Sequence, residues 1–239
     1  MTHTIPQTSF KYIDVTASVF VAVLIASNIA SSAKIVDTGI SLFGLSLAFD
    51  GGTLLFPLAF VACDILTEVY GFKAARRVIW TGFATLIFCA MFFFVLGILP
   101  PEASWEARTG SAAFSSILGG MSYGGIVLAS LSAYLAGKFS NTVILSKIKV
   151  KMKGRHLWVR VVSSTLAGQL LDTVIFVFVA TAAGVFGWGL FWSLLLTNYI
   201  LKCGIGIIMT PFTYWICRFL KRKEGVDVYD TGIKYRLWG

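Results

Sequence analysis

Four ionisable side chains interrupt long apolar stretches of this sequence, where a charge is costly. They are Asp64, Glu68, Asp172 and Lys202. Inside a lipid-embedded segment each such side chain costs about 2.5–3.5 kcal/mol, so these residues usually face a bundle interior and mark substrate or proton pathways. Three carboxylates and one ammonium group could therefore bind a polar solute, and one carboxylate could carry a coupling proton.

The spacing of these side chains places them on polar helix faces. The pairs are Asp64 with Glu68 at i,i+4, Gln169 with Asp172 at i,i+3, and Asn198 with Lys202 at i,i+4. Residues at these spacings share one face of a helix. Three helices with one polar stripe each pack most economically when the stripes face one another. The sequence therefore predicts a small polar cavity in which Lys202 can pair with Asp172.

Three more residues complete the predicted binding set. Asn28 lies in the first apolar stretch, Tyr199 follows Asn198 in the last one, and Phe176 lies one turn beyond Asp172 on the same face. A carboxylate can accept two parallel N–H bonds from a guanine-type edge, and aromatic rings stack on flat heterocycles. The inventory predicts a planar, polar, nearly neutral heterocycle as the small-molecule partner. It lacks the dense oxygen cage that would suit a simple inorganic ion.

Structural roles remain open for most of these candidates. Glu68 could pair at the membrane interface with Lys73, Arg76 or Arg77, and Asp172 with Lys202 could be a purely structural salt bridge. Asn28 could make an interhelical hydrogen bond, and Tyr199 could be ordinary packing. Arg76 and Arg77 either enforce topology or gate the cytoplasmic mouth through Glu68 or Asp64.

The composition predicts the elements that must position these residues. The 239-residue chain is 57% hydrophobic and 13% charged, and its mean hydropathy is +0.82. A soluble domain could not bury that much apolar surface, and several runs approach the ~18 residues that span a bilayer. We predict an all-α fold: one polytopic transmembrane domain over residues 1–239, with short cytoplasmic tails, in the plasma or inner membrane.

Six transmembrane helices are expected. Their predicted ranges are 15–35, 54–70, 78–99, 121–139, 157–184 and 189–217. All but three of the 20 lysines and arginines then lie on one side. Lys34 and Arg108 lie on the other side, and Lys202 lies within a span. By the positive-inside rule, both termini are cytoplasmic.

The basic loop expected after the fourth span decides much of that orientation. It is assigned Lys138, Lys147, Lys149, Lys151, Lys153, Arg155 and Arg160. We interpret this run mainly as a topology determinant, with contact to anionic membrane lipids as a further role. Nucleic-acid binding is the weakest interpretation of the +9 charge. A homo-oligomer stays open.

Residues 37–52 fit no span cleanly. The segment is rich in glycine and has Asp37 and Asp50 near its ends. A short hairpin or re-entrant piece on the outer side, which could cover the mouth of the site, is one interpretation. A plain surface loop is the other.

At these residues the chain resembles the queuosine precursor transporters, a family once described as vitamin uptake proteins. The matching stretches are "ASNIASSAK", "FDGGTLLFPLAFVACDILTEVYGFKAARRVI", "SAYLAGKFSN", "SSTLAGQLLDTVIF" and "NYILKCGIGIIMTPFTY". They touch five of the six expected spans. The resemblance implies an importer of 7-deazaguanines such as preQ0, preQ1 or queuine, which feed the salvage of a modified tRNA base. It highlights Asn28, Asp64, Glu68, Arg76, Arg77, Gln169, Asp172 and Lys202.

Three functions compete at this point. A secondary importer is favoured, because the sequence contains no Walker motif that would make the chain an ATPase. The alternative is the substrate-binding membrane subunit of an ATP-driven, multi-component vitamin-type uptake system. An intramembrane enzyme fares worst, since no HExxH, GxSxG or clustered metal-ligand set is present. We therefore expect no enzyme activity, no cofactor and no metal.

A weak similarity between two segments of the chain also suggests an inverted three-plus-three repeat. "ACDILTEV" (62–69) and "AGQLLDTV" (167–174) share Ala, Leu and Val at equivalent positions. They fall on the second and fifth spans, which are the matching positions of two three-helix halves.

Overall fold

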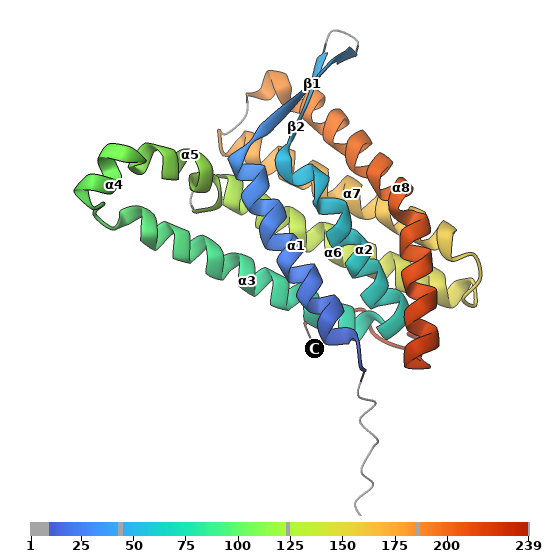
Figure 1. Ribbon diagram of the computed structural model, residues 1–239. Helices are drawn as coiled ribbons and strands as arrows, with labels where there is room; N and C mark the ends of the chain where they lie inside the picture. Colours follow the sequence, from blue (N-terminus) through green and yellow to red (C-terminus); the bar gives the residue numbers. More distant parts are fainter. Residues whose placement is uncertain (1–9, 43–44, 123–124, 185–186, 239) are drawn as a thin grey trace, which may run out of the picture.

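The computed structural model describes residues 10–42, 45–122, 125–184 and 187–238, and these form a helical bundle with a short hairpin at one end (Figure 1). The helices are α1 (Ile13–Ala33), α2 (Phe56–Ile65), α3 (Phe72–Ile98), α4 (Ala103–Arg108), α5 (Gly110–Ser122), α6 (Gly125–Lys151), α7 (Leu157–Ala182) and α8 (Phe191–Glu224). Short turns of 3-10 helix precede α2 (η1, Gly51–Leu54) and α8 (η3, Trp188–Leu190). The predicted helical membrane protein is thus confirmed in outline.

Five helical segments among the described residues are long and apolar enough to cross a membrane. They are Ile13–Ala33, Gly51–Tyr70, Phe72–Ile98, Leu157–Ala182 and Trp188–Glu224. Each overlaps one of the six predicted spans. The fourth predicted span corresponds to α6, which is 27 residues long but carries four lysines and is not among the five. The count of six, the side of the termini and the inverted repeat stay predictions.

The segment built around α2 is the central element of the bundle. In its most apolar window 78% of the residues lie inside the protein, whereas the other four apolar segments reach only 17–44%. It contacts α1, α6 and α8 (Figure 1). A helix surrounded by other helices rather than lipid can hold carboxylates, because its neighbours can supply their partners.

The α2 segment ends in a widened turn. Leu66–Tyr70 (η2) forms a π-helix that follows Ile65 without a break. Gly71 then turns the chain into α3 with a φ of 83°, which glycine adopts without the steric cost that a side chain imposes. Single π-turns occur often at functional sites. Here the π-turn contains Glu68.

A β-hairpin corrects the prediction that the fold is purely α-helical. β1 (Ile35–Leu42) pairs antiparallel with β2 (Leu45–Asp50), with Ile35 opposite Asp50 and Leu42 opposite Leu45. Of the two interpretations of residues 37–52, the hairpin is therefore the observed one. β2 contacts α1 and α8 at the top of the bundle in Figure 1. A role in covering the site stays a prediction.

An arm made of α4, α5 and the outer end of α3 was not predicted. It extends to the left of the bundle in Figure 1, and α5 packs against α3 and α1. Glu102 caps α4 by accepting hydrogen bonds from the amides of Ser104 and Trp105. Large apolar side chains such as Phe88 and Ile98 are more than 60% exposed on α3, as expected for a surface that contacts lipid.

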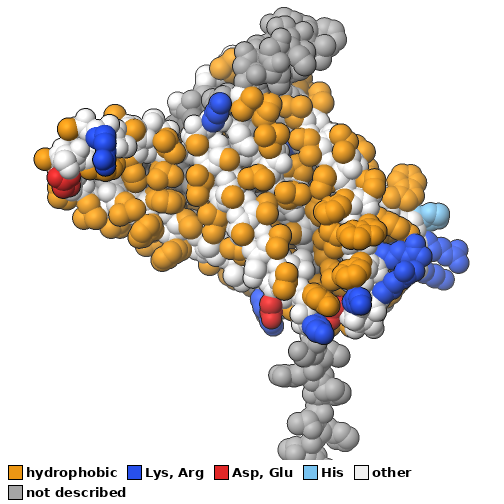
Figure 2. Space-filling view, in the orientation of Figure 1, with side chains coloured by type: hydrophobic (Ala, Val, Ile, Leu, Met, Phe, Trp, Pro, Cys, Tyr) orange, Lys and Arg blue, Asp and Glu red, His pale blue; other side chains and the backbone are white. Residues whose placement is uncertain are grey.

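The opposite end of the bundle holds the start of α1 and the end of α8. The Glu224 carboxylate at the end of α8 accepts hydrogen bonds from the amides of Lys11 and Tyr12 and from the Tyr70 hydroxyl. Lysine and arginine side chains gather near this end in Figure 2, whereas hydrophobic side chains cover most of the visible flank. We call it the basic end.

The C-terminal segment 225–238 packs across the basic end as a strap. Asp230 accepts hydrogen bonds from the Phe72 amide and the Ser146 hydroxyl. Trp80 donates a hydrogen bond to the carbonyl of Leu237 and packs against Trp238. The predicted tail is therefore an ordered part of the packed structure.

Candidate functional site

Asp64, on α2, is buried among polar side chains of α6 and α7. It is 2% exposed. Its Oδ1 accepts a hydrogen bond of 2.7 Å from Asn141 Nδ2 on α6, and its Oδ2 lies 3.5 Å from the hydroxyl of Thr165 on α7. The carboxylate therefore faces α6 and α7 and not the lipid.

Asp172 and Lys202 form the second part of the site. Lys202 Nζ donates to Asp172 Oδ2 at 2.8 Å, and both side chains are less than 10% exposed. The pair joins α7 to α8, as the spacing of these residues predicts. The Lys202 ammonium also lies 4.9 Å from the ring centroid of Phe56 on α2, which is a favourable cation–π distance.

Lys138 is a further charged residue in this part of the interior, and its predicted place in a loop is wrong. It was expected in a cytoplasmic loop, but α6 continues to Lys151, so Lys138 lies in the middle of a helix and is 0% exposed. Its ammonium interacts electrostatically with both Asp172 and Asp64. The resulting central cluster contains two carboxylates, Asp64 and Asp172, and two ammonium groups, Lys138 and Lys202. Its formal charge is zero.

Aromatic rings cover the Lys138 side of this central cluster. The Lys138 ammonium lies 3.3 Å from the ring centroid of Phe60, 5.6 Å from that of Phe56 and 5.7 Å from that of Phe20. Phe56 and Phe60 are on α2, so the same helix supplies a carboxylate and two flat apolar faces. Charged groups and ring faces therefore lie side by side in the protein interior.

Two glycines bring α6 and α7 close enough to make this arrangement. A Cβ atom at Gly137 would lie 2.7 Å from the Cβ of Asp172, and one at Gly168 would lie 2.8 Å from the Cβ of Asn141. Both distances are shorter than real side chains tolerate, so only glycine permits this crossing. Each glycine thus makes room for a polar residue of the opposite helix.

Several polar atoms in and beside the central cluster have no hydrogen-bond partner among the described residues. Both amide atoms of Gln169 are buried without a hydrogen bond to any described residue, and so are Lys138 Nζ and Asn141 Oδ1. Gln169 is 0% exposed. Buried polar groups in native proteins are nearly always hydrogen-bonded, and exceptions point to an unseen partner or a functional role. These atoms offer both donors and acceptors to a bound solute.

Glu68 belongs to a different cluster at the basic end. Its carboxylate accepts two hydrogen bonds from the Arg160 guanidinium, at 2.9 and 3.2 Å, and forms ion pairs with Lys221 and Lys149. The pairing with Lys73, Arg76 or Arg77, which was one alternative for Glu68, is therefore not the one observed. Arg160 and Lys149, which were assigned to a loop, lie in helices at 1% and 2% exposure because Glu68 and the strap supply their partners.

Asp227 of the strap completes this Glu68 cluster. It forms ion pairs with Lys149 and Lys221, the same cations that pair with Glu68. Partial burial alone would raise the pKa of the Asp227 carboxyl, but hydrogen bonds and charge from the two lysines outweigh it and lower that pKa. The strap is thus held to the helices by a carboxylate that stays ionised at neutral pH.

The remaining predicted residues lie outside both clusters. Asn28 accepts a hydrogen bond of 3.0 Å from the Ser130 hydroxyl, the interhelical contact named as its structural alternative. The Tyr199 hydroxyl donates to the Leu166 carbonyl at 3.3 Å. Asn198 Oδ1 is buried without a hydrogen bond to a described residue.

Phe176, Arg76 and Arg77 are less buried than the clusters. Phe176 is half-buried and Arg77 is exposed. Arg76 donates to the carbonyl of Arg236 in the strap at 3.0 Å. The structure thus connects Arg76 to the strap at the basic end, and it brings Asp64, Gln169, Asp172 and Lys202 together in the interior.

The residues that the sequence analysis missed are mainly on α6. Lys138 and Asn141 stand in "GKFSN", three residues apart and therefore on one helix face. Their spacing matched the criterion applied to the other spans. Lys138 lies inside the predicted fourth span, 121–139, but was counted with the basic loop, and Asn141 lies just beyond the end of that span.

Comparisons with known proteins find transporters among the relatives of this chain. Residues 50–216 match the family model described as "Putative vitamin uptake transporter". The chain is 29% identical over 201 residues to the "Probable queuosine precursor transporter" of Bacillus subtilis, with 83% of each chain covered. It is 28% identical to the "Queuosine precursor transporter" of Escherichia coli, over 64% of this chain and 63% of that one. A Haemophilus influenzae protein described as a "Probable queuosine precursor transporter" is 26% identical, over 69% and 66%. No solved structure matches the chain.

Proposed function

The chain belongs to this family of membrane transporters, and from that membership we propose that it imports queuosine precursors. The relatives are transporters and not enzymes, as the sequence predicts, and the apolar helices fit a multi-pass protein of the plasma membrane. The proposed cargo is a 7-deazaguanine such as preQ0, preQ1 or queuine. The proposed use of the cargo is salvage for tRNA modification.

The observation that carries the proposal is the central cluster. Two buried carboxylates are balanced by two buried ammonium groups, and the Gln169 amide beside them has no partner among the described residues. A purely structural network would be expected to satisfy its own buried groups. The open donors and acceptors therefore support a site whose last partner is the cargo.

The chemistry of a deazaguanine edge matches these groups. Its ring N–H and exocyclic amine donate two parallel hydrogen bonds, which Asp64 or Asp172 can accept. Its carbonyl oxygen is an acceptor for an ammonium group or for the Gln169 amide. Its flat ring system can stack against Phe56 or Phe60. Of the three proposed cargoes, preQ0 is uncharged at neutral pH and would leave the zero formal charge of the cluster unchanged, whereas the amine of preQ1 or queuine would add one positive charge.

We further propose a secondary mechanism. The sequence contains no Walker motif for ATP, and Asp64 or Asp172 could carry a coupling proton. The basic end would face the cytoplasm, following the distribution of lysine and arginine. The Glu68 cluster and the strap would then form the cytoplasmic closure, and the hairpin would lie on the outer side.

The test is uptake by cells that express only this chain. The host should lack its own synthesis and uptake of 7-deazaguanines, and labelled preQ0, preQ1 and queuine should be supplied separately. Uptake of at least one compound is expected for the wild type. Asp64→Asn and Asp172→Asn should each reduce the initial rate by tenfold or more at equal membrane abundance.

A matched control separates recognition from general damage. Asp14→Asn makes the same chemical change on an exposed residue at the start of α1 and should leave uptake unchanged. A well-inserted wild type that imports none of the three compounds would overturn the stand-alone importer. Equal loss in the control and the two buried variants would overturn the assignment of the site.

A further inference from the structure

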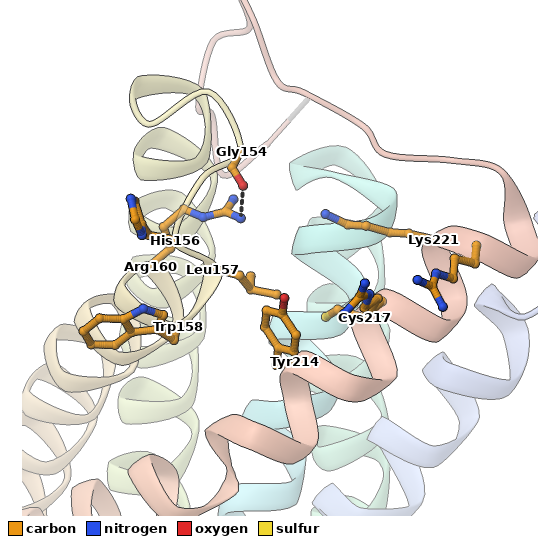
Figure 3. A pocket seen from close by; sticks show the side chains of 10 residues that line it. Gly154, His156, Leu157, Trp158, Arg160, Tyr214, Cys217 and Lys221 are labelled. Atoms are coloured by element: carbon orange, nitrogen blue, oxygen red, sulfur yellow. Dashed lines mark hydrogen bonds between the residues drawn. The ribbon is translucent and has the colours of Figure 1, made fainter.

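A second candidate site lies at the basic end, between the start of α7 and the end of α8. It is a cavity of about 600 Å³. Figure 3 shows His156, Trp158 and Arg160 on one wall and Tyr214, Cys217 and Lys221 on the other. Neither the transport proposal nor the family comparison assigns this cavity a role.

The α8 wall is built by helical spacing. The lining residues share one face, because Cys217 and Arg218 lie three and four residues after Tyr214, and Lys221 and Arg222 lie three and four residues after Arg218. This face is apolar toward the middle of the helix and cationic toward its end. The cavity therefore has an apolar part and a charged part along one direction.

The lining side chains include four arginines and lysines and no carboxylate. Two of the cations, Arg160 and Lys221, are already paired with Glu68. The other two, Arg218 and Arg222, are exposed and make no ion pair or hydrogen bond to any residue that the structure describes. The cavity thus holds two uncompensated guanidinium groups, with the His156 imidazole also lining it.

Aromatic side chains place the cavity at the edge of the apolar zone. Trp158 is 60% exposed and Tyr214 is 43% exposed. Nearby on α8, Trp215 is 64% exposed. Exposed tryptophan and tyrosine at the ends of transmembrane helices are typical of the level of lipid headgroups. The cavity would therefore open where a phosphate group and the start of an acyl chain are both within reach.

We propose that this cavity binds the headgroup of an anionic phospholipid, with Arg218 and Arg222 contacting the phosphate and with Trp158 and Tyr214 beside the upper acyl chain. Guanidinium groups match phosphate oxygens in a bidentate way. Basic pockets between helices are the usual form of such sites. A free phosphate would use the same guanidinium groups but would leave the apolar part of the cavity unused, so the lipid is the better match.

Binding to the purified full-length chain in neutral detergent tests this proposal. Short-chain phosphatidylglycerol, short-chain phosphatidylcholine and inorganic phosphate are added separately, and retained adducts are measured by native mass spectrometry with thermal unfolding as a second readout. Phosphatidylglycerol should bind at least tenfold more tightly than either comparator. Arg218→Gln combined with Arg222→Gln should weaken it by about tenfold to thirtyfold.

The chain offers a control of equal charge. Lys151→Gln combined with Lys223→Gln removes two exposed cations from the same end without touching the cavity, and it should change phosphatidylglycerol binding less than threefold. Should the double arginine variant fold poorly, Arg222→Gln alone should still weaken binding by about threefold to tenfold. Equal binding of phosphatidylcholine, equal loss in the control, or inorganic phosphate binding as tightly as the lipid would each overturn the proposal.

Discussion

The Glu68 cluster and the central cluster solve the same problem, a buried carboxylate in an apolar bundle, in opposite ways. Glu68 has three cationic partners and both of its oxygens are hydrogen-bonded. In the central cluster the charges balance one to one, and Gln169, Asn141 and Lys138 keep polar atoms without a hydrogen-bond partner among the described residues. The Glu68 carboxylate is fully paired, although Arg160 Nε beside it also has no hydrogen bond to a described residue, and the central cluster keeps more such atoms.

This difference indicates different roles. The Glu68 carboxylate has three cationic partners and no oxygen left to bind a solute. Its ion pairs therefore hold η2, α6, α7 and α8 together, and the two lysines that it shares with Asp227 hold the strap. A balanced cluster with unused donors and acceptors is poised for a further partner. Variants should therefore separate into those that weaken folding at the Glu68 cluster and those that weaken uptake at the central cluster.

The largest effect is expected for Glu68→Gln. The change leaves the buried Arg160 guanidinium without its counter-charge, and breaking a buried ion pair from one side typically costs about 3–5 kcal/mol. The free energy of unfolding, measured in detergent with denaturant, should fall by that order. Glu106→Gln, an exposed residue on α4, is the control and should change it by less than about 1 kcal/mol. A fully stable Glu68→Gln protein would remove the distinction between the clusters.

Lys138→Met should give the next largest effect, which is a loss of uptake. It removes the ammonium group that interacts electrostatically with Asp64 and Asp172. A charge-assisted hydrogen bond to cargo is worth about 1.5–3 kcal/mol, or roughly tenfold to hundredfold in rate. Lys151→Met, an exposed position on the same helix, should transport normally. Unchanged uptake by Lys138→Met would show that this ammonium group serves only the fold.

Gln169→Leu should reduce uptake by about tenfold while leaving Tm unchanged. The amide has no described partner to lose, so the apolar replacement of similar size costs no internal hydrogen bond. Thr181→Val is the comparison. The Thr181 hydroxyl is on the same helix and is also buried without a hydrogen bond to a described residue, but it lies outside the central cluster. A drop in Tm that accompanied the lost uptake would mean that Gln169 supports packing instead.

The smallest effect is expected for Asp227→Asn in the strap. Because the Asp227 side chain is 39% exposed, solvent screens its ion pairs, and the loss at neutral pH should be about 1 kcal/mol or less. The pKa of Asp227 is lower in the folded protein than its ordinary value of 3.8, so its stabilising contribution is complete above about pH 3.8 and disappears as the pH falls further. Tm of the variant and the wild type should therefore converge only in acid. A gap that persists there would point to a role other than charge.

Much of the fold could be predicted because helices that cross a lipid bilayer need long apolar segments, which are easily found in the sequence. A charged residue within an apolar run stands out, which is why Asp64, Asp172 and Lys202 were found and the Asp172 pair anticipated. Glu68 was found as well, but its partners were not, because Arg160 and Lys149 lie far from it along the chain. Such pairings depend on tertiary packing that no local pattern records.

The errors on α6 have a physical cause. A helix that faces other helices on most sides carries polar residues for its neighbours, so its apolar run is short and the fourth span was ended at Phe139. Lys138, one residue before that end, and every lysine of α6 beyond it were counted as loop. The arm of α4 and α5 could not be predicted either, because its small and polar residues resemble a loop in sequence and its helices depend on packing against α3.

The two-glycine crossing of α6 and α7 has a mechanical consequence. Gly137 and Gly168 lock these helices so closely that sliding one along the other would drive Asp172 or Asn141 into backbone. The pair should therefore travel as one rigid body through any transport cycle, carrying Lys138, Asn141, Gln169 and Asp172 as a template of unchanging shape. Asp64 on α2 and Lys202 on α8 belong to helices outside this pair. We expect the cargo to bind when α2 and α8 move toward α6 and α7, and to be released when they move away.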